Sequence, residues 1–143
     1  MTNLRFATAV HILVLLAHEN ADAPERAACS RHMGSSIGAN AVVVRRIMGA
    51  LTDAGLVRTK AGPQGGAWLA RPPSKIRVSD IYEAVDESPA IGLRRKGNSA
   101  CPVGRAAPGV IGGLLAKMDG AARAALSKVT LAQVLKDVEA RAR

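Results

Sequence analysis

The chain has 143 residues, which is enough for one domain, or for one domain with an oligomerisation extension. Hydrophobic residues make up 48% of it, but it holds only one Phe, one Tyr and one Trp, so a core of Ala, Val, Leu and Ile in closely packed helices is expected. A net charge of +9 at pH 7 favours a polyanionic partner, most commonly nucleic acid. No apolar run approaches the roughly 20 residues of a membrane span. Two cysteines without a secretory signal predict free thiols in the cytoplasm, and no membrane partner.

The first predicted helix covers residues 4–18 and is apolar on almost every side. Phe6, Val10, Leu13 and Ala17 form one stripe, and neighbouring aliphatic residues widen it. A helix of this kind must be covered on more than one side. We expect a second subunit to supply part of that cover.

A short helix and a longer one follow a loop over residues 19–29, whose last three residues form an extended piece. Ser30 is a good N-cap for a helix over 31–37 that ends at Gly38, although a start at Glu25 is an alternative. The longer helix follows after about three residues. A short helix, a glycine-containing turn and a longer helix are typical of the helix-turn-helix.

The longer helix has two contrasting faces between its predicted N-cap, Asn40, and Gly55, which ends it. One face carries an apolar stripe at helical spacing: Val44, Ile47, Met48 and Leu51. The opposite face carries Val42, Arg45, Arg46 and Gly49, with Val43 on its flank. Arginine can contact guanine edges and phosphates, and valine can contact thymine methyl groups. We therefore predict that Asn40, Val42, Val43, Arg45 and Arg46 lie in a DNA major groove.

Residues 56–60 and 67–70 have the pattern of two strands, and the glycine-rich segment 61–66 between them is typical of a turn. A hairpin directly after such a helix is the wing of a winged helix. Arg58, Lys60 and Gln64 are predicted to contact the DNA backbone or the minor groove. An ordinary hairpin with solvated cations is the alternative.

The second half of the chain reads as three further helices. Ser79 or Asp80 is expected to cap a short one that ends at Val85, and a long one is expected over 102–126 after a loop. The long helix has one large apolar face, and a face of small residues opposite it could let a partner helix approach closely. Its two faces are Ile111, Leu114, Leu115, Met118, Ala122 and Ala125, and Gly109, Gly113, Ala116 and Gly120. Thr130 and Gln133 form a capping-box pattern for a last helix over 131–142.

Cys101 precedes Pro102 and is therefore a candidate N-cap of the long helix, in the positive field of its terminus. Four nearby cations, like this field, favour the reactive thiolate: Arg94, Arg95, Lys96 and Arg105. Cys29 comes just before the short helix of the helix-turn-helix. A thiol switch that joins Cys29 to Cys101, within a chain or across a dimer, is one hypothesis. Two unrelated reduced cysteines are the alternative.

No catalytic or metal-binding constellation is evident. His11, His18 and His32 have no metal-ligand spacing with one another or with the cysteines. The adjacent Asp86 and Glu87 have no partner base. The glycine-rich turn over 62–66 lacks the Gly-Lys-Ser/Thr ending of a phosphate loop. We therefore predict a protein that is not an enzyme and that has no cofactor and no metal.

Several motifs together resemble one family over essentially the whole chain. They are Arg5-Phe6-Ala7, Val42-Val43-Val44-Arg45-Arg46-Ile47, Ala54-Gly55-Leu56-Val57, the glycines of 62–66, Ser79-Asp80-Ile81, Ala84-Val85, Cys101-Pro102-Val103-Gly104 and Thr130-Leu131-Ala132. They are similar to those of the Rrf2 family of bacterial winged-helix regulators, which includes the IscR, NsrR and CymR types. The resemblance implies a homodimer with a long crossing helix that binds a pseudo-palindromic operator and usually represses. Iron–sulfur relatives carry three clustered cysteines before the long helix, where this chain has only Cys101.

The predicted fold is mainly α with a small β-hairpin: a winged helix-turn-helix over residues 1–73, and a linker, a sensor loop and dimerisation helices over 74–143. The predicted function is a dimeric, sequence-specific transcriptional regulator of double-stranded DNA, acting as a repressor. Oxidation or modification of Cys101 with Cys29 would control it. One alternative is a regulator whose small-molecule ligand lies between the wing module and the long helix. Another is a module that binds protein and not DNA.

Overall fold

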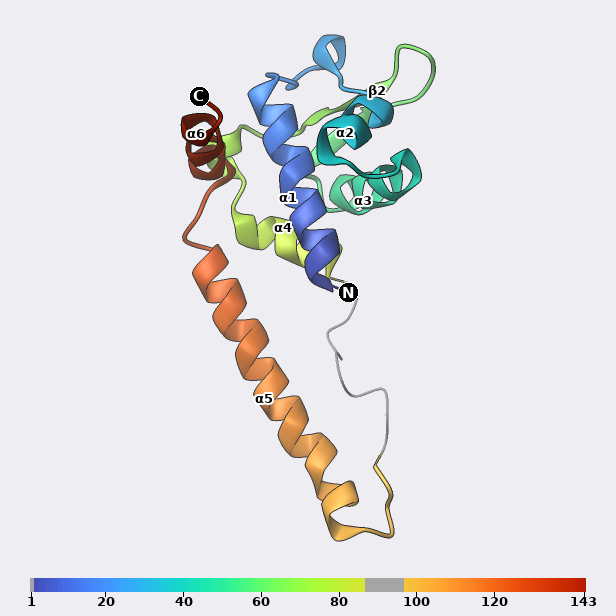
Figure 1. Ribbon diagram of the computed structural model, residues 1–143, viewed down its shortest axis with the longest axis vertical. Coiled ribbons are helices and arrows are strands. Elements are labelled where there is room, and N and C mark those ends of the chain that lie inside the picture. Colours follow the sequence, from blue (N-terminus) through green and yellow to red (C-terminus); the bar gives the residue numbers. More distant parts are fainter. Residues whose placement is uncertain (1, 87–96) are drawn as a thin grey trace.

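The computed structural model describes residues 2–86 and 97–143, and it shows a helical body from which one long helix projects (Figure 1). The body holds five helices and a two-stranded antiparallel hairpin. The elements, in chain order, are α1 (Thr2–His18), the 3₁₀ turn η1 (Pro24–Arg26), α2 (Ser30–Ile37), α3 (Ala41–Asp53), β1 (Val57–Lys60), β2 (Gly66–Leu69), the 3₁₀ turn η2 (Pro73–Lys75), α4 (Val78–Val85), α5 (Pro102–Leu126) and α6 (Leu131–Arg141). The predicted fold class, mainly α with a small hairpin, is confirmed.

Helix α1 lies at the centre of the body and is covered mostly by its own chain. It contacts α2, α3, α4, α6 and β2, and residues along most of its length are buried: Ala9, Ile12, Leu13, Val14, Leu16 and Ala17. The chain itself therefore supplies most of the cover that this helix needs, and the expected contribution of a second subunit stays a prediction. Val10 and Leu15 remain only half-buried, and they face the side on which α6 lies.

Helices α2 and α3 form the predicted helix-turn-helix, with one correction at the start of α2. The residue that caps α2 is Cys29 and not Ser30, because the Cys29 Sγ accepts a hydrogen bond from the His32 N–H at 3.4 Å. The alternative start at Glu25 is excluded, since that residue lies in η1. At Gly34, a Cβ atom would lie 2.6 Å from the carbonyl oxygen of Ala39, so glycine is what lets α2 pack this closely on the turn.

The hairpin packs against the body through the alternate residues of its strands. Val57 pairs with Leu69 across the two strands, and both are buried together with Ala67. The segment before α2 adds a short antiparallel bridge, in which Ala28 and Ala67 exchange backbone hydrogen bonds of 2.8 and 2.9 Å. This confirms the extended piece predicted there, and it attaches the start of α2 directly to the wing.

The N-cap of helix α4 lies two or three residues before the predicted caps, Ser79 and Asp80. Arg77 is its N-cap residue, and Asp80 lies inside the helix, where its carboxylate accepts a hydrogen bond from the Arg77 N–H at 2.9 Å. The segment between α5 and α6 lies beside the start of α4, because Arg77 forms an antiparallel bridge with Thr130. Thr130 and Gln133 form the predicted capping box of α6. Leu131, at the start of α6, is fully buried in the core.

Helix α5 extends away from the body as one continuous helix through Pro108, and it has no buried residue (Figure 1). The predicted apolar stripe is divided in the structure: Leu115 and Ala122 are half-buried, whereas Ile111, Leu114 and Met118 are 47–68% exposed. The small-residue face is also open to solvent. In the described part of the chain, no helix is long and apolar enough to cross a membrane.

Candidate nucleic-acid interface

Helix α3 is held in place by its buried face and by its N-cap. The four residues of the predicted apolar stripe are all buried. The Asn40 side-chain oxygen accepts a hydrogen bond from the Val42 N–H at 2.8 Å, which confirms the predicted cap. Gly55 follows the helix with a φ of 74°, a left-handed conformation that glycine adopts at no steric cost. The helix is therefore continuous over 13 residues, and its buried face anchors it in the body.

The opposite face of α3 points outward. Val42 and Val43 are 49% and 45% exposed, and Arg45, Arg46 and Gly49 are exposed as well. Exposed valines beside two arginines give this face both apolar contacts and hydrogen-bond donors, the combination that a major groove can accept. The geometry that the sequence predicts for this surface is present, and the contact of each residue with DNA stays a prediction.

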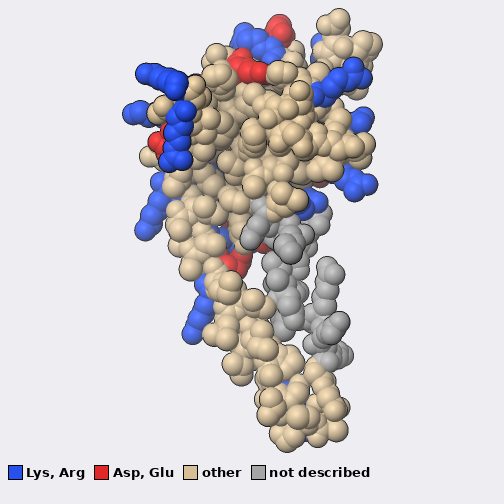
Figure 2. Space-filling model, viewed as in Figure 1, with Lys and Arg blue, Asp and Glu red and all other residues tan. Residues whose placement is uncertain are grey.

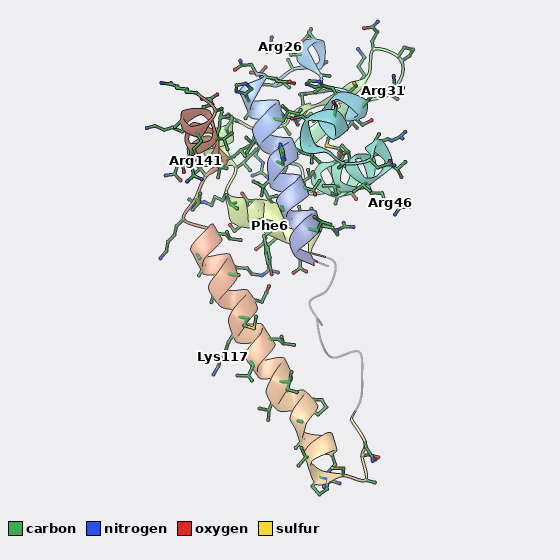
Figure 3. The ribbon with its side chains drawn as sticks, viewed as in Figure 1. Phe6, Arg26, Arg31, Arg46, Lys117 and Arg141 are labelled. Carbon is green, nitrogen blue, oxygen red and sulfur yellow. The ribbon has the colours of Figure 1, made fainter. Side chains whose placement is uncertain are left out.

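The two arginines of α3 differ in their surroundings. Arg45 donates a hydrogen bond from its Nε to the Ala41 carbonyl at 3.3 Å, and it lines a cleft of about 450 Å³ between α2, α3 and the hairpin. Lys60 and Ser30 line the same cleft. Arg46 does not line this cleft, and its side chain extends away from the body beside α3 (Figure 3). Arg45 and Lys60 thus line one basic cleft, whereas Arg46 lies outside it.

The hairpin separates the cations that were predicted to act together. Lys60 lines the cleft beside α3, but Arg58 pairs across the strands with Trp68 and lines a second hollow with Arg71. Gln64 is exposed in the turn between the strands. Lys60 therefore lines the cleft beside α3, whereas Arg58, two residues earlier on the same strand, lines the other hollow.

Three further residues lie on these surfaces although their sequence pattern does not mark them as DNA contacts: Ser30, Arg31 and Arg71. Arg31, on the first turn of α2, lies on the same side of the body as Arg46 (Figure 3). Lys and Arg side chains follow this edge of the body, and α5 displays few of them (Figure 2). A cation on the first turn of a helix before a recognition helix is a signal that could have identified Arg31.

The two cysteines lie on different parts of the molecule. Cys101 caps α5, as predicted, and its Sγ accepts a hydrogen bond from the Gly104 N–H at 3.5 Å. Cys29 caps α2 in the body, and both thiols are exposed and free. Cys101 stands at the far end of α5, a helix of 25 residues and so about 37 Å long at 1.5 Å per residue (Figure 1). The single chain does not bring them together, and the predicted cations at 94–96 lie outside the described residues.

A cluster of polar side chains joins α4 to the body-proximal end of α5. Arg123 pairs with Asp119 at 2.8 Å, with Glu83 at 3.0 Å and with Asp86 at 3.1 Å. Its guanidinium lies 5.3 Å from the centre of the Tyr82 ring, a cation–π contact. The sequence pattern does not reveal this cluster, because residues from the two helices that form it are 37 positions apart in the chain.

Comparison with known proteins matches residues 2–137 to the model of the Rrf2 family, described as "Iron-dependent Transcriptional regulator". The chain belongs to the Rrf2 family. It is 32% identical over 106 residues to YwnA of Bacillus subtilis, described as an HTH-type transcriptional regulator, with 73% of this chain and 74% of YwnA covered. It is thus a transcriptional regulator and not an enzyme, and regulators of this family bind DNA.

Solved structures of similar fold support the winged-helix architecture. A transcriptional regulator from Lactobacillus plantarum has a TM-score of 0.79 at 24% identity, with 97% of this chain and 91% of that chain covered. CymR of B. subtilis, titled "the Global Cysteine Regulator", has a TM-score of 0.62 at 16% identity over 92% of this chain and 93% of that chain. At these identities the likeness shows the fold alone.

The family is described as iron-dependent, and its iron–sulfur members bind their cluster through three cysteines. The residues of this chain do not fit such a cluster. The whole chain holds two cysteines, Cys29 and Cys101, which lie on different elements. Among residues 2–86 and 97–143, no group of three or more His, Cys, Asp and Glu side chains is placed to hold a metal ion.

Proposed function

We propose that this Rrf2-family regulator is a homodimeric, sequence-specific repressor that binds a pseudo-palindromic operator. The observation that carries the proposal is the outward surface of α3, where exposed valines lie beside Arg45 and Arg46 on a helix fixed by its buried face. Residues 1–73 form the DNA-binding unit in this proposal, and residues 74–143 form the linker, the sensor loop and the dimerisation helices. Binding to a chromosomal operator would place the protein in the bacterial cytoplasm.

Within this unit, Arg46 reads a base edge in the major groove, and Val42 and Val43 contact thymine methyl groups. Arg45 and Lys60 hold a phosphate group at the cleft between α3 and the hairpin. The Asn40 side-chain oxygen accepts the helix-capping hydrogen bond, which leaves its NH2 group to donate to DNA. Gln64 and Arg58 contact the backbone or the minor groove from the hairpin.

The exposed apolar side of α5 supports the homodimer. Five large apolar side chains on this helix are 47–72% exposed: Val103, Val110, Ile111, Leu114 and Met118. Contiguous apolar surfaces of this kind mark protein–protein contacts. A second copy of α5 offers the same surface, as a two-fold symmetric interface requires. Two winged helices joined in this way would read two half-sites of one operator.

We also propose that oxidation of the two thiols controls DNA binding. Both thiols are exposed, so a peroxide could take two electrons from two of them and leave a disulfide and water. Disulfides require Cα atoms about 4.4–6.8 Å apart, so a link between Cys29 and Cys101 in this conformation would join two chains. Non-reducing electrophoresis after mild peroxide treatment should show a linked dimer for the wild type and none for Cys101→Ser. Identical behaviour of the two proteins on gels and on DNA would exclude the switch.

Selection of bound DNA from a random pool, with reduced and with oxidised protein, tests the function as a whole. We expect enrichment of a sequence with two-fold symmetry, and binding that weakens steeply with salt because phosphate contacts release counterions. Failure to enrich any sequence, with no salt-dependent binding, would favour a module that binds protein. Expression of a reporter gene placed behind the selected operator then gives the sign of regulation.

A further inference from the structure

Helix α5 carries two sets of residues on different parts of its length. The five exposed apolar side chains of the proposed dimer surface all lie between Val103 and Met118. The charged residues that bond to α4, Asp119 and Arg123, follow them and lie next to the body. Figure 1 shows α4 beside this end of α5. The α4–α5 junction, formed by these contacts, therefore lies between the winged helix and the surface that would meet a second chain.

The chain just after α5 is attached to the body through its backbone. The Ser127 carbonyl accepts a hydrogen bond from the Arg77 guanidinium at 2.6 Å, and the Val129 carbonyl accepts one from the Val78 N–H at 2.9 Å. These contacts hold one end of the helix, and a second contact along its length is needed to set its direction. Because no residue of α5 is buried, apolar packing contributes little to that second contact.

Arg123 supplies the second contact through three of its nitrogen atoms. Its Nε bonds to Asp119, one turn earlier on α5, at 2.8 Å. At the end of α4, its Nη1 bonds to Glu83 at 3.0 Å and its Nη2 to Asp86 at 3.1 Å. A guanidinium is planar with donors in fixed directions, so three carboxylates bound at once define its orientation. The Asp86 side chain is only 6% exposed, so its pair with Arg123 is screened less than a pair between two exposed side chains.

A change of angle at the α4–α5 junction is magnified along α5. The helix extends from Asp119 to Val103, which corresponds to about 24 Å at 1.5 Å per residue. Rotation of this part by about 10° about the junction moves its far end by about 4 Å, close to the rise of one base pair. The separation of two recognition helices joined through α5 therefore depends on the angle at each junction.

We propose that Arg123 is a positioning residue for operator recognition: it sets the direction of α5 and thereby selects the spacing between the two half-sites. Arg123 itself contacts no base. The inference rests on the proposed homodimer and its operator, but the direction of α5 can be measured without DNA. Loss of the Arg123 contacts should leave the affinity for a single half-site unchanged and widen the range of spacings that the dimer accepts.

The two native cysteines allow a direct measurement of the direction of α5. Cys29 lies in the body just before α2, Cys101 lies at the far end of α5, and both are exposed and free. Nitroxide labels on both, in full-length protein mixed with an excess of unlabelled protein, give the distance within one chain by pulsed electron paramagnetic resonance. We expect a narrow distance distribution for the wild type and one about twice as wide for Arg123→Ala. Equal widths would overturn the proposal.

Operators whose half-sites are moved together or apart by one and two base pairs test the consequence for DNA binding. The wild type should prefer one spacing at least tenfold over its neighbours. Arg123→Ala should reduce this preference to threefold or less and should bind a single half-site within twofold of the wild type. A full preference in the variant, or equal weakening at every spacing and at the half-site, would overturn the proposal. A wild type that binds no operator would instead overturn the proposed function, and the selection of spacing with it.

Lys128→Ala is the control for loss of charge. Lys128 is exposed and lies two residues after the end of α5, so this variant removes a cation near the junction without changing the Arg123 contacts. It should keep the label distribution and the spacing preference of the wild type. The same change in Lys128→Ala as in Arg123→Ala would assign the effect to net charge and overturn the proposal.

Arg123→Lys provides a second variant should Arg123→Ala fail to fold, as judged by circular dichroism. It keeps a positive charge beside the nearly buried Asp86 carboxylate. An ammonium group lacks the planar donors that orient the guanidinium among three carboxylates, so Arg123→Lys should still widen the label distribution and weaken the spacing preference. A folded Arg123→Lys protein with the width and the preference of the wild type would overturn the proposal.

Discussion

The Tyr82 hydroxyl donates a hydrogen bond to the Asp119 Oδ1 at 2.8 Å and thereby joins α4 to α5. The ring of Tyr82 also packs edge-on against Phe6 of α1, with centroids 5.6 Å apart. Tyr82 therefore connects three helices. Since α5 has no buried residue of its own, this contact and the Arg123 ion pairs fix its direction relative to the winged helix. In the proposed dimer, that direction sets the distance between the two recognition helices.

Replacement of Tyr82 by Phe tests this connection, because it keeps the ring and removes only the hydroxyl. We expect the free energy of unfolding at pH 7 to fall by about 1 kcal/mol, as for one lost hydrogen bond. The far-ultraviolet circular dichroism should stay unchanged, and urea denaturation gives the difference. A variant as stable as the wild type would show that this hydrogen bond does not help to hold the two helices together.

The hydrogen bond between Tyr82 and Asp119 should make the free energy of unfolding depend on pH. Hydrogen bonds from Arg123 and from Tyr82 hold the pKa of Asp119 below its ordinary value, so the stabilisation is present above about pH 4 and is lost as pH falls through the lowered value. The hydrogen bond to Asp119, followed by burial, raises the pKa of Tyr82 above its ordinary value of about 10. The stabilisation is therefore present below about pH 10 and is lost as pH rises through the raised value. The stability difference between wild type and Tyr82→Phe should shrink at both extremes of pH.

The elements that could be predicted from the sequence are those whose causes are local. Asn40, the apolar stripe after it and Gly55 define α3 within 16 residues, and the same is true of Thr130 and Gln133 for α6. The starts of α2 and α4 were misplaced because Cys29 and Arg77 are uncommon capping residues, and the more usual Ser30, Ser79 and Asp80 stand next to them.

The features that could not be predicted depend on contacts between distant parts of the chain. Tyr82 and Asp119 are 37 residues apart, and His18 and Glu139, which join α1 to α6, are 121 apart. Arg58 and Lys60 are two residues apart in one strand, but they line different hollows once α3 and Trp68 are in place. Residues two apart in a strand point to the same face, so the spacing does not show which neighbouring elements each of them meets.

Arg45 and Arg46 should respond differently to truncation if the proposed roles are right. Arg46→Ala should weaken operator binding by roughly 1–3 kcal/mol and relax the preference at one base pair in each half-site. Arg45→Ala should weaken binding to all sequences alike. It should also reduce, by about one, the slope of the logarithm of the binding constant against the logarithm of the salt concentration. Fluorescence anisotropy with the selected operator and its single-base variants measures both effects, and Arg141→Ala, on α6, is the control (Figure 3). A uniform loss for Arg46→Ala would reassign that residue to phosphate.

Two substitutions on α5 distinguish which of its faces forms the proposed dimer. Leu114 lies on the exposed apolar side, and Ala116, also exposed, lies on the small-residue face. Leu114→Asp should give a monomer by analytical ultracentrifugation and lower operator affinity at least tenfold, because each half-site is then bound alone. Ala116→Asp should remain a dimer. The reverse result would assign the interface to the small-residue face, and two dimeric variants would exclude α5 as the main contact.

Gly34 and Gly49 form a matched pair within the helix-turn-helix. A methyl group at Gly34 would lie 2.6 Å from the carbonyl oxygen of Ala39, a backbone atom that cannot move without the turn, so Gly34→Ala should destabilise the protein by roughly 1–3 kcal/mol. At Gly49, in α3, a Cβ atom would meet nothing within 4 Å, so Gly49→Ala should raise stability by up to about 1 kcal/mol through helix propensity. Urea denaturation measures both changes.

Because the Gly34 clash displaces the turn that leads into α3, Gly34→Ala should also weaken operator binding at temperatures where the variant is folded. Full binding by a folded Gly34→Ala protein would show that the turn can shift without moving the recognition helix.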